Sequence, residues 1–215
     1  MRLITNKFYR RMMIMDTLSQ KALEMAWQSL KIEKETIEQA SEYLDKDEFL
    51  KVAKALSECK KIITCASGSS GIAAKKFQHS LCCIDRPACF MSPAEAVHGG
   101  LGVVTNEDCV IMVSRGGKTV ELLPIIDVVK KKGAKLIAVT ENLNSPLADN
   151  ADLIIKMQIE KESDKYNMMA TASYVATIAI FDALLAAVME LTGYRKEQFG
   201  LIHPGGAVGE RLNKK

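Results

Sequence analysis

Five short apolar runs, rich in β-branched residues and most of them followed by a polar or glycine-containing turn, constrain the fold of this chain more than any other feature. The runs are residues 62–66, 88–91, 109–113, 135–139 and 152–157. Amphipathic stretches separate several of them, and strands that alternate with helices form right-handed βαβ units. Strands without polar alternation suit a parallel sheet that is covered on both faces. The pattern therefore predicts an α/β fold with helices on both sides of a parallel sheet.

The segment before the first run is predicted to be helical. From about Thr17 to Ser57, apolar residues recur at mixed spacings of three and four, and proline and glycine are absent. A length of 215 residues fits one α/β domain. We therefore expect an N-terminal helical segment, residues 1–57, to pack on a single domain of residues 58–215.

Charge and cysteine content narrow the functional class. The net charge is +3, and no run concentrates it, so nucleic acid is not an expected partner. The six cysteines lack C-x-x-C spacing and lie mostly in apolar stretches. Buried thiols in a reducing cytoplasm therefore explain them better than disulfides. The N-terminus lacks the apolar stretch and cleavage site of a signal peptide, so a cytoplasmic protein is expected.

One segment, residues 168–191, is long enough to span a bilayer. Asp182 lies past its middle and Glu190 near its end. A charge deep in lipid costs about 2.5–3.5 kcal/mol even on the most lenient scale. The sequence thus favours a helix in a globular core or a subunit interface, and no membrane association is expected.

Two turns are suited to bind an anion. ASGSSG (66–71) and SRGGKT (114–119) each follow an apolar run, and ligands bind at the carboxyl ends of parallel strands, where helices begin. For either turn alone, ordinary turn formation and helix capping explain the residues equally well. The occurrence of both turns favours anion binding.

A single monophosphate fits these turns better than a nucleotide does. A Walker A loop would require glycine where Met112 stands, inside the run. The G-x-G-x-x-G dinucleotide fingerprint and the G-x-S-x-G elbow of serine hydrolases are both missing.

Further side chains could transfer protons. Glu160 and Glu162 follow the last run, His98 lies in a short proline-started helical stretch, and His203 precedes a Pro-Gly-Gly sequence. The histidines have no third ligand nearby at helical spacing, so neither a metal site nor a cofactor is expected. Carboxylates and imidazoles beside a phosphate site suggest proton transfer on a sugar phosphate.

With these residues identified, the chain resembles sugar isomerase (SIS) domain proteins, and among them the arabinose 5-phosphate isomerase group. The similarity extends from about Leu50 to Leu212. Its carriers are ASGSSG (66–71), PAEAVHG (93–99), SRGGKTVELL (114–123), AVTEN (138–142), IEKE (159–162), ATAS (170–173) and HPGGAVGERL (203–212). The resemblance implies a three-layer αβα sandwich with a five-stranded parallel sheet. It also implies a homotetramer with sites between subunits.

The resemblance assigns roles to the candidate residues. Hydroxyl groups of the two turns would hold the phosphate, namely those of Ser69, Ser70, Ser114 and Thr119. The implied reaction interconverts an aldose and a ketose through an enediol. Glu160 or Glu162 would act as the base, and His203 with His98 would move protons during ring opening. In this family such residues can come from a neighbouring chain.

Departures from the group's pattern leave the substrate unassigned. Ser69 stands where a G-K-S-G turn has lysine, and Arg115, Gly116 and Lys118 occupy a loop that commonly reads S-N-S-G-E-T. Arg115 and Lys118 would then supplement the phosphate site or pair with a second acidic group of the substrate. The group's pair of C-terminal CBS modules is not expected here. A non-catalytic sensor of sugar phosphates is the alternative function.

Overall fold

The protein is described by a computed structural model covering residues 2–205, with side chains from Met15 onward. Within this range five parallel strands form one sheet in the order β2-β1-β3-β4-β5. The strands are β1 (Ile62–Cys65), β2 (Ala88–Phe90), β3 (Cys109–Val113), β4 (Lys135–Thr140) and β5 (Leu153–Lys156). Each coincides with one of the five apolar runs, so the predicted parallel sheet is confirmed.

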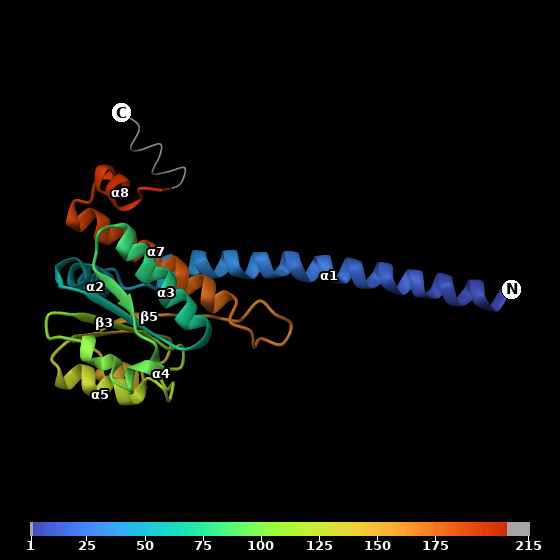
Figure 1. Cartoon of the computed structure of the whole chain (residues 1–215). Helices are drawn as coiled ribbons and strands as arrows, with labels where there is room; N and C mark the ends of the chain where they lie inside the picture. The colour runs from blue at the N-terminus through green and yellow to red at the C-terminus, as the bar shows by residue number, and fades with distance from the viewer. Residues whose placement is uncertain (1, 206–215) are drawn as a thin grey trace.

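Helices cover both faces of the sheet (Figure 1). One face carries α2 (Lys46–Glu58), α3 (Gly68–Cys83) and α7 (Ala172–Thr192). The other carries α4 (Pro93–Ala96), the 3-10 helix η1 (Gly100–Val103), α5 (Leu123–Lys131) and α6 (Pro146–Asn150). Two remaining helices, α1 (Arg2–Tyr43) and α8 (Lys196–Ile202), lie at the chain's two ends. Buried residues accordingly form two clusters, one on each face, which confirms the three-layer αβα sandwich.

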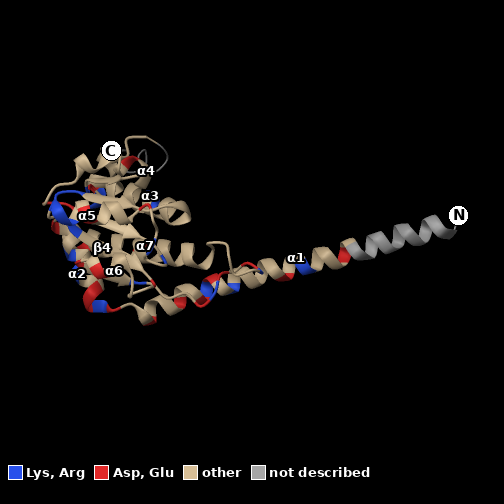
Figure 2. Cartoon of the chain, turned by 90° about the horizontal axis from the view of Figure 1, so that it is seen from below, with Lys and Arg blue, Asp and Glu red and all other residues tan. Residues whose placement is uncertain are grey.

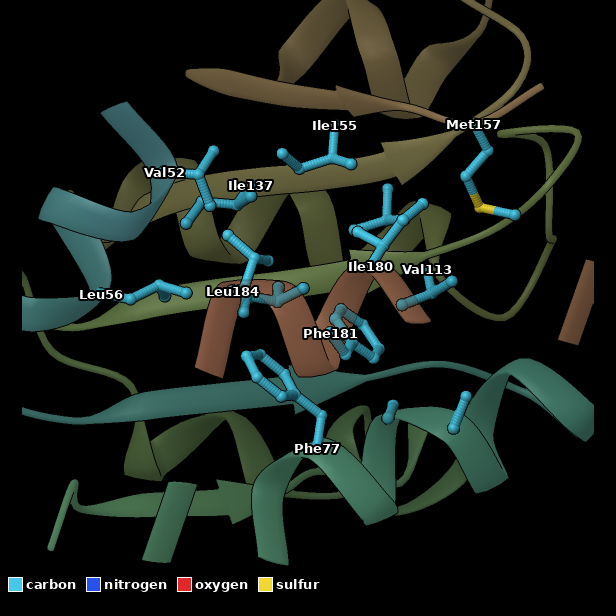
Figure 3. Packing of buried hydrophobic residues seen from close by; sticks show 14 of the residues in the cluster. Val52, Leu56, Phe77, Val113, Ile137, Ile155, Met157, Ile180, Phe181 and Leu184 are labelled. Atoms are coloured by element: carbon cyan, nitrogen blue, oxygen red, sulfur yellow. The ribbon is translucent and has the colours of Figure 1, made fainter. Parts of the chain in front are cut away.

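The core of the first face is built around α7 (Figure 3). The rings of Phe77 in α3 and Phe181 in α7 stack with centroids 4.3 Å apart, and both are fully buried. Lys76 forms an ion pair with Asp182, each of them adjacent in sequence to one of these rings. Among the described helices, α7 has a length and composition that would also suit a membrane span. Here it packs on α1, α2 and α3, so the prediction of a core helix is confirmed.

The helix after β3 begins later than its apolar spacing suggests. The amphipathic stretch after β3 starts at Lys118, but α5 begins only at Leu123. Pro124 explains the difference, because proline lacks an amide hydrogen and is tolerated only in the first turn of a helix. Gly133, with a φ of 73°, follows the helix and donates its N–H to the Lys130 carbonyl, which is typical of a C-terminal cap.

The N-terminal segment consists of two helices instead of one. Asp45 interrupts it, since its carboxylate accepts hydrogen bonds from the amides of Asp47 and Glu48 and caps α2. The second half of α1 packs on the domain through buried residues such as Ile32. Acidic and basic residues are interspersed along this part of α1 (Figure 2).

The first half of α1 extends beyond the domain (Figure 1). Met15 and Leu18 are 60% and 56% exposed there. The packing of this part of residues 1–57 therefore stays a prediction.

All six cysteines are free thiols. Cys65 and Cys109 are buried, but the other four are half-buried, so the expectation that all six are buried is wrong for those four.

Candidate active site

The two turns that were predicted to bind an anion lie side by side because of the strand order. Strand β1 pairs with β2 on one side and with β3 on the other, and Cys65 lies opposite Met112 in the register. The chain therefore changes direction across the sheet between β1 and β3. In open parallel sheets this change of direction leaves a crevice at the carboxyl ends of the two strands, where ligands bind.

The first turn leads directly into α3. Ser67 precedes the helix, and Ser69 and Ser70 lie in its first turn, both half-buried. A side chain at Gly71 would place its Cβ 2.7 Å from the Ala66 carbonyl oxygen, so glycine allows the helix to start this close to β1. The first amide groups of a helix lack partners within the helix, so this end of α3 is suited to an anion.

The second turn is held closed by its own side chains. Ser114 is buried, and its hydroxyl lies 2.7 Å from that of Thr119. Gly117 has a φ of 64° and is buried against Ser145, while Lys118 is exposed. The Gly117 carbonyl accepts a hydrogen bond from the Leu147 amide, which ties this turn to α6.

Arg115 joins the second turn to two carboxylates. Its Nε donates to Glu141 Oε2 at 2.7 Å, and its Nη1 donates to Glu162 Oε1 at 2.9 Å. Glu141 also accepts a hydrogen bond from the Ile159 amide, so it fixes the segment after β5. Sequence reasoning missed Glu141, although its position directly after β4 was a usable signal.

Glu162 is almost fully enclosed. Its side chain is 4% exposed, and Oε2 accepts hydrogen bonds from the Thr171 amide and hydroxyl and from the Ser173 amide. Burial alone would raise the pKa of Glu162, but the hydrogen bonds from Ser173 and Thr171 outweigh it and place the pKa below its ordinary value. Glu162 is therefore ionised at neutral pH and links Arg115 to the start of α7.

Glu160 lies in a different environment. It is exposed, and its Oε1 accepts a hydrogen bond from Nε2 of Gln39 in α1. The two candidate carboxylates thus differ: Glu162 is committed to four hydrogen bonds, whereas Glu160 is open to solvent.

Neither histidine is among the described residues that line the cavity or the hollow beside the two turns. His98 is exposed and follows α4 on the β2 side of the sheet. His203 ends α8, where its ring stacks on Phe199. The hydroxyl of Tyr194, just after α7, donates a hydrogen bond to the carbonyl of Cys83, the last residue of α3. Helix α8 follows Tyr194, so it lies at the end of α3 and α7 that is opposite the turns (Figure 1). The rest of the HPGG segment, from residue 206, lies outside the described residues.

Space for a ligand is present next to the first turn. A cavity of about 300 Å³ is lined by residues that include Ser67, Lys75, Ser92 and Glu121. Sequence reasoning missed Lys75 and Glu121 as lining residues. A much smaller hollow of about 20 Å³, on the other side of the turn, is lined by Ser69, Ser70, Arg115 and Ser173, among others.

The described residues hold no metal site that would compete with this crevice. No group of three or more His, Cys, Asp or Glu side chains is placed among them to hold a metal ion. A cavity of about 470 Å³ lies at the β5 edge of the sheet, lined by α1, α2 and β5 residues and by Leu143, whereas the first turn follows β1 near the opposite edge.

Comparison with known proteins adds a family match. The model of the SIS domain matches residues 55–187. The arabinose 5-phosphate isomerase KpsF of Escherichia coli is 35% identical over 186 residues, which are 86% of this chain and 59% of that protein. The chain therefore spans less than two thirds of the length of this curated relative.

Two solved structures match at high coverage. A candidate sugar-phosphate isomerase of Listeria monocytogenes is 44% identical with a TM-score of 0.84, over 86% of this chain and 98% of that one. The c3406 protein of E. coli CFT073, solved in complex with a sugar-phosphate ligand, is 30% identical with a TM-score of 0.82, over the same shares of the two chains.

Proposed function

This chain belongs to the SIS domain family, and from that membership we propose that it binds a sugar monophosphate and isomerises it between its aldose and ketose forms. One observation carries the proposal. The strand order brings the Ser-rich turn after β1 and the Ser/Thr turn after β3 together at one crevice. Two hydroxyl-bearing turns and the start of α3 at one point suit a compact dianion such as a phosphate monoester.

The phosphate would be held mainly by hydroxyl and amide groups. Ser69 and Ser70 offer theirs from the first turn of α3, and Ser114 and Thr119 offer theirs from the second turn. Arg115 and Lys118 play different parts in this proposal. Arg115 orders the turn through its ion pairs with Glu141 and Glu162. Lys118 is exposed, and its charge attracts the anion.

The isomerisation requires one proton to move between neighbouring carbons. A base removes the proton from C2 of the aldose while the C1 carbonyl oxygen gains a proton, which gives an enediol. C1 then takes up a proton while the C2 hydroxyl loses one, which gives the ketose. We assign the base to Glu160 or Glu162. Glu162 is ionised and rigidly held, and Glu160 is free to reorient toward a substrate.

The histidines and the exposed part of α1 support an assembly of several copies. We propose a homotetramer in which sites form between subunits, so that His98 and His203 act next to the turns of another copy. Exposed large apolar residues on α1, such as Trp27, would then be covered by a partner. Six free thiols suit a cytoplasmic location.

The phosphate site can be tested at Thr119. The variant Thr119→Ala is expected to weaken binding of arabinose 5-phosphate at least about tenfold, because a hydrogen bond to a charged group contributes about 1.5–3 kcal/mol. Isothermal titration calorimetry measures the affinity, and a thermal-shift panel of sugar phosphates identifies better ligands. Thr105→Ala, an exposed threonine before β3, is the matched control and should bind as the wild type does. If the wild type, Thr119→Ala and Thr105→Ala bind the ligand with equal affinity, Thr119 is not part of the phosphate site.

A further inference from the structure

Two cysteines meet at the end of the sheet opposite the proposed phosphate site. Cys59 follows α2, and Cys109 is the first residue of β3. Cys109 Sγ contacts the Ala55 carbonyl oxygen at 3.5 Å, and Cys59 Sγ contacts that of Leu56 at 3.7 Å. The Cys59 amide donates to the same Ala55 carbonyl oxygen at 3.1 Å, so both cysteines meet at the last turn of α2. Cys109 is buried, while Cys59 is half-buried and therefore reachable by a small reagent.

A guanidinium group borders this thiol pair. Arg86, from the segment between α3 and β2, donates Nη2 hydrogen bonds to the carbonyls of Leu56 and Cys59. The same nitrogen lies 3.8 Å from Cys59 Sγ. The carbonyl end of α2 would by itself disfavour a thiolate. Because Arg86 engages those carbonyls, its charge offsets them and favours the thiolate of Cys59.

The other thiols have no comparable environment. The neighbouring Cys109 thiol, followed by the charge of Arg86, outweighs burial and lowers the pKa of Cys59. The neighbouring Cys59 sulfur, followed by burial, raises the pKa of Cys109. Burial raises the pKa of Cys65 to about 12 and also raises the pKa values of Cys83 and Cys89. A nucleophilic sulfur thus lies next to a protonated one.

We propose that Cys59 and Cys109 form a peroxide-reactive dithiol that closes to a disulfide. The Cys59 thiolate attacks one peroxide oxygen, the O–O bond breaks, and the departing oxygen leaves with a proton as water or an alcohol. The resulting sulfenic acid on Cys59 is attacked by the Cys109 sulfur, which gives up its proton. The S–S bond forms as the S–O bond breaks, and water leaves. The two thiols lose two electrons and the peroxide gains them.

The first test uses the reduced, full-length protein and compares alkylation rates. The rate of iodoacetamide labelling at each cysteine is followed by peptide mass spectrometry between pH 5 and 10. Labelling of Cys59 should reach half its maximum at a lower pH than labelling of Cys83 does. At pH 7 it should be at least about threefold faster than labelling of Cys83, because its larger thiolate fraction outweighs the lower nucleophilicity of a less basic sulfur. Labelling of Cys59 that is no faster than that of Cys83 would overturn the proposal.

The second test identifies the oxidised product. Treatment with one equivalent of hydrogen peroxide should give a Cys59–Cys109 linked peptide pair that is two hydrogens lighter than the separate peptides. In Cys109→Ala the linkage should vanish and a sulfenic acid should accumulate on Cys59, where a 1,3-dione traps it. Cys83→Ala is the matched control and should form the linkage as the wild type does. Oxidation of other cysteines with Cys59 left reduced contradicts the proposal.

Discussion

The variant Gly117→Ala is expected to lower the free energy of unfolding by about 2–5 kcal/mol and to abolish sugar-phosphate binding. Gly117 has a φ of 64°, and a left-handed conformation costs an alanine roughly 1–2 kcal/mol. A Cβ there would also lie 2.0 Å from Ser145 Oγ, so the turn or α6 must shift, which costs about 1–3 kcal/mol more. The shift displaces the turn that carries Ser114 and Thr119. Urea denaturation and calorimetric titration measure the two effects.

Gly116→Ala is the matched control for this prediction. A Cβ at Gly116 would have no heavy atom within 4 Å among the described residues, and the residue is exposed. Its effect on stability should stay within about 0.5 kcal/mol. Equal stability of the two alanine variants would show that the contact between Gly117 and Ser145 does not shape the turn.

The second large effect is expected at Glu162. Glu162→Ala should lower the free energy of unfolding by about 3 kcal/mol, because the amides of Thr171 and Ser173 lose their carboxylate acceptor. The ion pair adds little to this estimate, since the Arg115 side chain is 41% exposed. The melting temperature should fall by about 8 °C. Glu160→Ala should change it far less, because Glu160 is exposed; an equal loss in both variants would refute the structural role of Glu162.

The acid dependence of stability gives this prediction a second readout. Because the pKa of Glu162 is lowered in the folded state, its ionised form stabilises the fold fully above about pH 4.3, the ordinary value for glutamate. This contribution is lost as the pH falls through the folded-state pKa. The stability difference between wild type and Glu162→Gln should therefore be constant from pH 5 to 7 and shrink below about pH 4. A difference that is unchanged down to pH 2 would contradict the assignment.

The strands and the positions of the two turns were predictable from sequence because local patterns determine them. Unbroken apolar runs reveal buried strands, and serine and glycine after such a run reveal a turn, as residues 62–71 illustrate. The late start of α5 was also readable in principle, since Pro124 is visible in the sequence.

The contacts that organise the candidate site were not predictable, because they join residues far apart in the chain. Arg115 pairs with Glu141 and Glu162, which lie 26 and 47 residues away. The sequence suggested Arg115 as a phosphate ligand and Glu162 as a base. The fold tests neither role. The ion pair between Arg115 and Glu162 depends on the placement of β3 beside β4, and no local sequence pattern predicts that placement.

The most direct test of the central claim is hydrogen exchange between solvent and a bound sugar phosphate. The protein is incubated in D₂O with arabinose 5-phosphate and with other sugar phosphates that raise its melting temperature, and NMR follows the C1 and C2 protons. We predict that the wild type introduces deuterium at C2 of the aldose or C1 of the ketose. We also predict that Glu160→Gln or Glu162→Gln abolishes this incorporation while binding survives. Binding without exchange for every ligand would contradict the isomerase and indicate a sugar-phosphate sensor.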